Sequence, residues 1–277
     1  MAFIWAGGFV AGKVVTGYAG PFTVAFFRFA IATLILLLIL SRKKGESTRI
    51  NLKIFALVVA AAFTGEVLYN YFFFSGIKLT EAGQSSVILS IAPIAMIFAS
   101  FLLFGEKIRV GHIFGVLFSL IGAWIVISKG DLNSIFSAIG IGEIYLLLCV
   151  VCVVVFAFLS KQLLKELSPI VTLVYLSSVG SMILLGPAIM EMQQMPVDFT
   201  STGFLGSLLY LAIGPSVFAV MLYYEGIAKI GPAKASQYMN LIPVFSVVFA
   251  FFILGESLSA SLLVGGGLVT TGLYLAK

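Results

Sequence analysis

The chain has 277 residues, of which 61% are hydrophobic and only 10% are charged, and its mean hydropathy is +1.18. A water-soluble domain carries about 25% charged residues, so this composition excludes a soluble globular fold and makes the lipid bilayer the solvent. The net charge of +5 does not indicate a nucleic-acid partner, because the basic residues occupy short loops instead of clustering on one polar face.

Apolar runs predict ten membrane-spanning helices separated by short loops. In chain order they are expected at about residues 1–15, 22–40, 52–74, 82–104, 110–128, 141–164, 170–190, 203–224, 232–254 and 259–276. The first of them is short. Aligning Lys13 and Pro21 with Lys161 and Pro169 predicts that a few residues of the natural N-terminus precede Met1.

The chain also repeats itself with a constant offset of 150 residues and no gap. The paired positions are Gly76 and Gly226, Ile77 and Ile227, Ser86 and Ser236, Pro93 and Pro243, Phe101 and Phe251, Gly105 and Gly255, Glu106 and Glu256, Gly115 and Gly265, and Gly122 and Gly272. We therefore divide the chain into two five-helix halves, residues 1–128 and 141–277. Because each half holds an odd number of spans, the halves point in opposite directions. The predicted fold is an all-α integral membrane protein with inverted repeats, as in alternating-access transporters.

Lys and Arg are distributed unequally between the two ends of this predicted bundle. Twelve of the 16 fall at one end and three at the other, while Arg28 lies inside a helix. The positive-inside rule places the basic end in the cytoplasm. Both termini are then cytoplasmic, and the acidic loop with Glu191 and Asp198 is external.

Two long motifs carry a family resemblance. The first half reads SIAPIAMIFASFLLFGEKIRVGHIFG, the second reads NLIPVFSVVFAFFILGESLSASLLVG, and the chain opens with WAGGFVAGK after four residues. A mid-helix Pro, an apolar stretch ending in Gly-Glu and further Gly residues on the next helix resemble the EamA-type ten-helix exporters of the drug/metabolite transporter superfamily. One branch of that superfamily, the YddG-like exporters, carries aromatic amino acids.

The resemblance implies a bundle around a central cavity. In the family this cavity is lined mainly by the first, third, fourth, sixth, eighth and ninth helices, and the fifth and tenth helices lie at the periphery and often face a second copy. It further implies a multi-pass protein of the bacterial inner membrane that works as a monomer or homodimer and exports amino acids or other metabolites. No cofactor and no metal are expected.

Glu66 is the most informative single residue, because an ionisable group inside a membrane helix costs several kcal/mol unless it faces protein or water. Its helical face is shared by residues at i+3, i+4 and i+7, which are Tyr69, Asn70 and Phe73. This face is a candidate cavity wall that binds substrate or exchanges a proton. The structural alternative is an ion pair with Arg28 or Lys13.

Arg28 itself has two interpretations. A guanidinium binds a carboxylate through two hydrogen bonds, so Arg28 is a candidate site for an amino-acid carboxylate. The alternative, which we favour because the second helix is not a usual cavity helix, is snorkelling or an ion pair within the bundle.

Polar residues precede the repeat-related prolines of the fourth and ninth helices. We expect Pro93 and Pro243 to act as hinges, because a proline removes one backbone hydrogen bond and lets a helix bend. The neighbouring candidates for substrate binding are Gln84, Ile88, Gln237, Tyr238 and Asn240. Hydrogen bonding between helices is the alternative role for their polar side chains.

Aromatic residues make up 14% of the chain, and several fall on the expected cavity helices. The candidates are Trp5, Phe9, Tyr69, Phe73, Phe156, Tyr210 and Phe218. They suit an apolar or aromatic solute, although helix packing and lipid contact account for most such residues. The Gly-Glu pairs are expected to have a role in the fold, with a left-handed Gly ending one helix and the Glu capping the start of the next.

The sequence offers little for an enzyme. His112 lies near a loop, Asp131 and Asp198 lie in external loops, and Cys149 and Cys152 lie in an apolar run where thiols are inert. The function that the resemblance implies is a secondary transporter that exports small organic metabolites, namely amino acids including aromatic ones. A multidrug or cationic-compound exporter and a solute channel are the alternatives.

Overall fold

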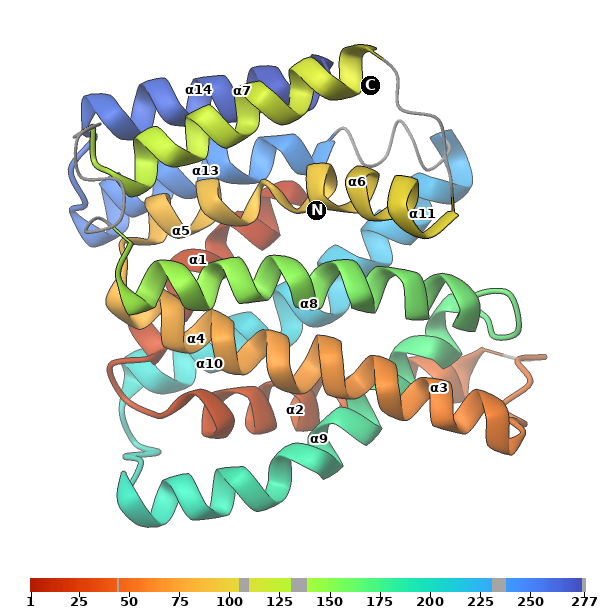
Figure 1. Ribbon diagram of the computed structural model, residues 1–277. Helices are drawn as coiled ribbons and strands as arrows, with labels where there is room; N and C mark the ends of the chain where they lie inside the picture. Colours follow the sequence, from red (N-terminus) through yellow and green to blue (C-terminus); the bar gives the residue numbers. More distant parts are fainter. Residues whose placement is uncertain (44, 105–109, 131–138, 231–237, 276–277) are drawn as a thin grey trace.

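The computed structural model describes residues 1–277 except 44, 105–109, 131–138, 231–237 and 276–277 (Figure 1). In the first half, the helical elements are α1 (Ala2–Val15), α2 (Pro21–Arg42), α3 (Leu52–Ala62), η1 (Phe63–Leu68), α4 (Tyr69–Leu79), α5 (Ala82–Leu89), α6 (Ala92–Phe104) and α7 (Val110–Ile127). In the second half, they are α8 (Ile141–Leu163), α9 (Pro169–Gln194), α10 (Thr202–Ile213), η2 (Gly214–Ala219), α11 (Val220–Ile230), η3 (Tyr238–Asn240), α13 (Leu241–Phe249), η4 (Ala250–Leu254) and α14 (Ala260–Leu275).

The described residues form an all-α fold without strands, as predicted. Several of these elements follow one another without a break, so that they make ten apolar segments. Five of the segments have 18 or more residues and are long enough to cross a membrane, and five shorter apolar helices of 10–17 residues complete the set among the described residues. Most of the segments coincide with the predicted spans to within a few residues, while the start of the predicted ninth span, 232–254, lies outside the described residues.

One predicted span is divided in the structure. The fourth span was expected to be continuous over residues 82–104, but α5 ends at Leu89 and α6 begins at Ala92, with a turn between them. Pro93 is the reason, because in a continuous helix it could donate no hydrogen bond to the carbonyl of Leu89, four residues earlier, and its ring would clash with that carbonyl. Pro243 lies near the start of α13, after the short 3₁₀ turn η3.

The helices pack mainly between the two halves. In Figure 1, α7 and α14 lie side by side at one edge of the molecule, α2 and α9 lie at the opposite edge, and the remaining helices fill the space between them. α4 packs on α8, and α1 packs on both α10 and α13. Each of these pairs joins one element of the first half to one of the second.

Glycines permit the close approach of α7 and α14. A Cβ at Gly122 would lie 2.5 Å from the carbonyl oxygen of Gly265, and a Cβ at Gly272 would lie 2.6 Å from the carbonyl oxygen of Gly115. No Cβ fits at these distances, so the two backbones touch only because these residues are glycines.

Two glutamates cap helices across the fold, at the end of the bundle opposite the basic one. Glu191, at the end of α9, accepts hydrogen bonds from the backbone amides of Phe22 and Thr23 at the start of α2. Glu256 accepts from Ala82 N at 2.6 Å and from Gly83 N at 3.0 Å. The Gly-Glu expectation is therefore corrected, because Glu256 caps α5 of the other half rather than the helix that follows it.

The predicted glycine role is confirmed in the same motif. Gly255 ends η4 in the left-handed conformation, with φ of 69°. At the start of the following helix, the hydroxyl of Ser259 accepts from Leu262 N and takes the role expected for Glu256. The first-half counterparts, Gly105 and Glu106, lie outside the described residues.

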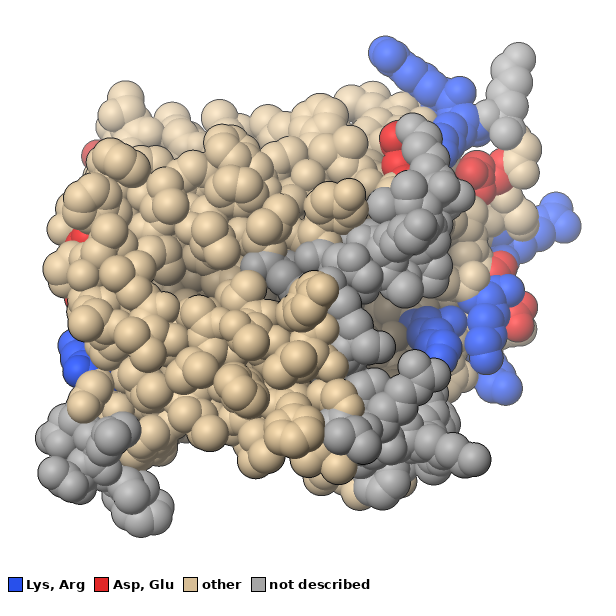
Figure 2. All heavy atoms as spheres, turned by 90° about the horizontal axis from the view of Figure 1, so that it is seen from above, with Lys and Arg blue, Asp and Glu red and all other residues tan. Residues whose placement is uncertain are grey.

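Basic side chains gather at one end of an apolar body (Figure 2). This end carries the end of α2, the start of α3 and the end of α8, in agreement with the unequal distribution of Lys and Arg along the sequence. A wide band of uncharged side chains separates it from the other end in this view. The charge pattern is that of a protein embedded in a bilayer.

Candidate functional site

Two π-helices interrupt the third and eighth spans at matching places in the repeat. η1 covers Phe63–Leu68, and η2 covers Gly214–Ala219, within one residue of the position that the offset of 150 gives. A π-helix widens one helical turn and leaves backbone carbonyls without their usual donors, and such turns occur often at functional sites.

Side chains satisfy the carbonyls that these two turns release. Asn70 donates through Nδ2 to the carbonyls of Gly65 at 3.1 Å and Glu66 at 3.0 Å. Ser216 donates through Oγ to the carbonyl of Leu211 at 2.9 Å. Both interruptions are therefore stable local structures with their own hydrogen bonds.

Arg28 joins the two interruptions. From α2 it donates through Nε to Ser216 Oγ at 2.8 Å and through Nη1 to Asn70 Oδ1 at 3.0 Å. Its guanidinium also lies 5.2 Å from the centre of the Phe29 ring. One cation thus connects the π-helical regions of both halves, and its hydrogen-bonding partners are neutral side chains of the bundle.

Glu66 lies in η1 and is half-buried. Its side chain packs against α9, where a Cβ at Gly180 would lie 2.6 Å from the Cβ of Glu66. Among the described residues, no donor lies within hydrogen-bonding or ion-pair distance of its carboxylate, but the charge of Arg28 attracts it through space. Lys13, one of the two partners considered from the sequence, instead donates to the carbonyls of Ile77, Lys78 and Thr80 at the end of α4.

The predicted aromatic residues of the third span form a packed group with α1. Phe9 and Phe73 are buried and their ring centres lie 5.5 Å apart, and the ring of Tyr69 stacks on Phe73 at 5.9 Å. Asn70, on the same helical face, is only 2% exposed. These four residues therefore lie close together, in contact with protein in this conformation.

Two further aromatic candidates tie α1 to the eighth span. Trp5 donates through its indole nitrogen to the carbonyl of Pro215, inside η2, at 3.2 Å. Tyr210 donates through its hydroxyl to the carbonyl of Ile4 at 2.9 Å. The π-helix η2 is thus held by Trp5 on one side and by Arg28 on another.

The remaining candidates are scattered. Gln84 donates to Glu143 at 3.1 Å, Ile88 is fully buried, and the Phe156 ring fills the space that a Cβ at Gly65 would need. Phe218 and Tyr238 are more than half exposed. Gln237 and the side chain of Asn240 lie outside the described residues.

Sequence reasoning missed Ser216 and Gly180. Ser216 is the counterpart of Glu66 at the offset of 150, so the repeat itself contained the signal that both positions belong to one site. Gly180 gave no signal, because only the tertiary contact with Glu66 shows why a side chain is absent there.

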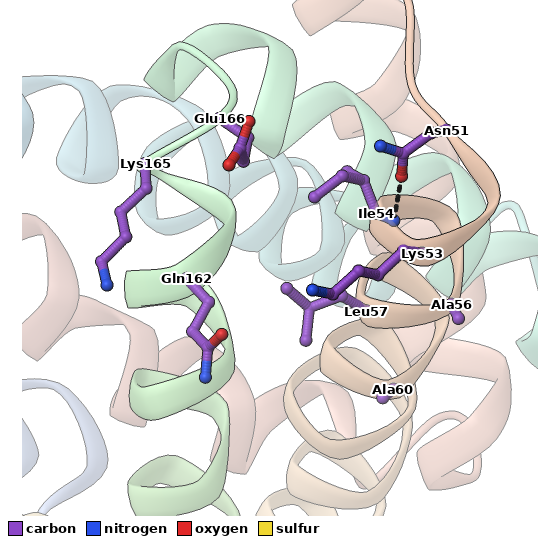
Figure 3. Close-up of a pocket in the computed structure, with 9 residues that line it drawn as sticks. All are labelled: Asn51, Lys53, Ile54, Ala56, Leu57, Ala60, Gln162, Lys165 and Glu166. Atoms are coloured by element: carbon purple, nitrogen blue, oxygen red, sulfur yellow. Dashed lines mark hydrogen bonds between the residues drawn. The ribbon is translucent and has the colours of Figure 1, made fainter.

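Two cavities lie at the ends of the bundle. One, of about 500 Å³, lies between the start of α3 and the end of α8 at the basic end (Figure 3). The other, of about 150 Å³, lies at the opposite end and is lined by residues such as Glu81, Gln84 and Lys129. Neither touches the aromatic group around Phe73.

Comparison with known proteins finds a transporter family and several transporters among the relatives of this chain. The EamA-like transporter family matches residues 1–128 and 140–276. The uncharacterized transporter YyaM of Bacillus subtilis is 24% identical over 96% of this chain and 87% of its own length. An uncharacterized transporter of Archaeoglobus fulgidus is 28% identical over 98% and 93%, and a chloroplastic WAT1-related protein of Arabidopsis thaliana is 28% identical over 99% and 67%.

A solved crystal structure supports the fold. It covers 100% of this chain and 94% of its own chain, with a TM-score of 0.70 and 18% sequence identity. The helical repeats, the apolar surface and these relatives agree, and the chain belongs to the EamA-like transporter family of multi-pass membrane transporters.

Proposed function

We propose that this transporter exports small organic metabolites, namely amino acids including aromatic ones, by alternating access. It lies in the bacterial inner membrane with both termini in the cytoplasm, as the positive-inside rule supports. The two stretches 1–128 and 141–277 act as two units that rock against each other around the middle of the bundle.

The observation that carries this proposal is the hydrogen-bonded bridge through Arg28. Its two partners belong to or adjoin the π-helices of opposite halves, at Ser216 and Asn70. If the halves rock, the distance and orientation between the two π-helical regions must change. The hydrogen bonds of Arg28 can break and re-form, so that they can stabilise more than one arrangement of the halves. The interruptions at Pro93 and Pro243 supply a bending point in each half.

The substrate class follows from the side chains near this bridge. Phe9, Tyr69 and Phe73 offer aromatic surface, and Glu66 offers a carboxylate that no described residue binds through a hydrogen bond, although Arg28 attracts it through space. Aromatic rings bind apolar groups, and a carboxylate binds an ammonium group. An amino acid with an apolar or aromatic side chain has both.

A second candidate is the export of organic cations. Glu66 is an ionisable carboxyl on the helical face that also carries Tyr69 and Phe73, and a carboxylate together with aromatic rings favours cationic compounds through charge attraction and cation–π contact. An organic cation has no carboxylate that would need a basic binding partner. This candidate therefore agrees with the structure, in which Arg28 donates its hydrogen bonds to Ser216 and Asn70.

Counterflow in proteoliposomes tests these possibilities. Vesicles loaded with an unlabelled aromatic amino acid are diluted into labelled tracer, beside vesicles loaded with a polar amino acid and vesicles tested with a cationic dye. We expect saturable, transient accumulation of the aromatic tracer. Dye movement without any amino-acid signal would support the cation exporter instead, and flux without counterflow would indicate a channel.

Glu66→Gln tests the role of the carboxylate. Since this carboxylate makes no hydrogen bond among the described residues and Arg28 attracts it only through space, its neutralisation should change the melting temperature little, while transport falls. Counterflow across a pH series and thermal melting in detergent measure both effects, with Glu46→Gln in an exposed loop as control. Unchanged transport with an unchanged pH profile would exclude Glu66 from the pathway.

A further inference from the structure

The cavity at the basic end has a polar rim. Lys53 reaches from α3 toward the end of α8, where Gln162 and Glu166 lie, and Lys165 lies at the edge (Figure 3). Two lysines against one glutamate leave one positive charge in excess. Asn51 also lines the cavity, and its Oδ1 accepts from Ile54 N at 2.8 Å to cap α3.

Below this rim the cavity is apolar and its walls are small. Ala56 and Ala60 have small side chains that leave room on the surface of α3, and Leu57 adds a larger apolar side chain to the lining. An exposed apolar stripe lies on the face of α8 that carries Gln162, at successive spacings of seven, four and three residues from it. It consists of Leu148, Val151 and Val155, which are 38%, 57% and 41% exposed. A chain-like apolar ligand therefore has a continuous path from the rim along α8.

The inverted repeat supplies an internal comparison. The offset of 150 relates Lys53 to Gly203, and the offset of 148 that aligns Lys13 with Lys161 relates Glu166 to Tyr18. In the structure, the Tyr18 hydroxyl lies in the space that a Cβ at Gly203 would occupy. The related site at the other end is therefore filled by protein, and the open groove at the basic end is not a necessary consequence of the fold.

We propose that this groove binds one anionic phospholipid with a hydroxylated headgroup, of the phosphatidylglycerol type, from the leaflet at the basic end. The ammonium group of Lys53 binds the phosphate, Lys165 at the edge adds a second positive charge, and the excess of one positive charge matches the single negative charge of this lipid. The carboxylate of Glu166 accepts from the headgroup hydroxyls. An acyl chain lies over Ala56 and Ala60 and follows the stripe of α8. Basic pockets between membrane helices favour such lipids.

Native mass spectrometry of the purified full chain tests this site. The protein is mixed with equal amounts of phosphatidylglycerol and phosphatidylcholine of the same acyl chains, and the first bound lipid is quantified. We expect the wild type to prefer phosphatidylglycerol. The double variant Lys53→Gln/Lys165→Gln should lose this preference by about fivefold for each lysine.

The matched control is Lys161→Gln/Lys43→Gln, which removes the same charge from exposed positions at the same end, outside the cavity. Equal losses in both double variants would overturn the proposal in favour of general attraction to the basic end. Ala60→Phe fills the apolar part and should weaken binding of both lipids with every charge in place. Displacement of bound lipid by soluble glycerol phosphate would also contradict the proposal, since the apolar path would then contribute nothing.

Discussion

Arg28 shows how one residue connects both repeats. It lies inside the second predicted span, away from both ends, and it donates hydrogen bonds to Ser216 and Asn70. The bridge depends on the shape of the guanidinium, because one planar group donates in two directions from separate nitrogens. A buried polar network of this kind specifies one arrangement of helices when all its members are satisfied.

Arg28→Lys should lower the stability of the protein by about 1–3 kcal/mol, because a lysine cannot reproduce both hydrogen bonds and leaves buried polar groups unsatisfied. Thermal melting in detergent measures the change. Arg42→Lys, at the exposed end of the same helix, is the control and should have no effect. If the two variants melt alike, the bridge does not stabilise this conformation.

At the scale of elements, helix ends in this protein are capped by glutamates from distant segments. Glu191 and Glu256 bind the starts of α2 and α5, and each contact joins the two halves. A carboxylate at a helix start satisfies free backbone amides and interacts favourably with the positive end of the helix dipole. Each cap therefore stabilises a helix start and also holds that helix next to a segment of the other half.

Glu256→Ala should destabilise the protein by about 0.5–2 kcal/mol through loss of the α5 cap. Glu81→Ala is a close control, because Glu81 occupies the N-cap position of the same helix but its side chain makes no capping hydrogen bond. The measurement is again the melting temperature, supported by hydrogen exchange of the α5 amides. Faster exchange at α5 is expected for Glu256→Ala alone, and equal exchange in both variants would refute the cap.

For the whole molecule, the helix pairs at the two edges hold the halves together. The contact of α7 with α14 relies on glycines whose backbones meet without intervening side chains. In a membrane the hydrophobic effect does not drive helices together, so close packing of small residues supplies much of the attraction. This edge is the place where a small change in volume acts on the packing of both halves.

Gly122→Ala should separate α7 from α14 and cost about 1–3 kcal/mol, as overpacking does. Gly267→Ala is the matched control on α14, since no atom lies within 4 Å of the added Cβ there, and it should be neutral or slightly stabilising. The melting temperatures of both variants in detergent, compared with that of the wild type, measure these effects. A loss of stability at Gly267 equal to that at Gly122 would mean that helix–helix contact is not the cause.

The amino-acid sequence alone determined the membrane setting, the ten spans, the repeat and the family, because hydropathy, charge bias and repeated motifs are local or periodic signals. It also placed Glu66 and Asn70 on one face of a helix. What the tertiary structure decided is which groups meet: Arg28 with Ser216 and Asn70, Glu256 with the start of α5, and Lys53 with a groove instead of a neighbouring side chain. Such pairings join residues far apart in the chain, and no local pattern records which distant partner satisfies a buried donor or a free helix end.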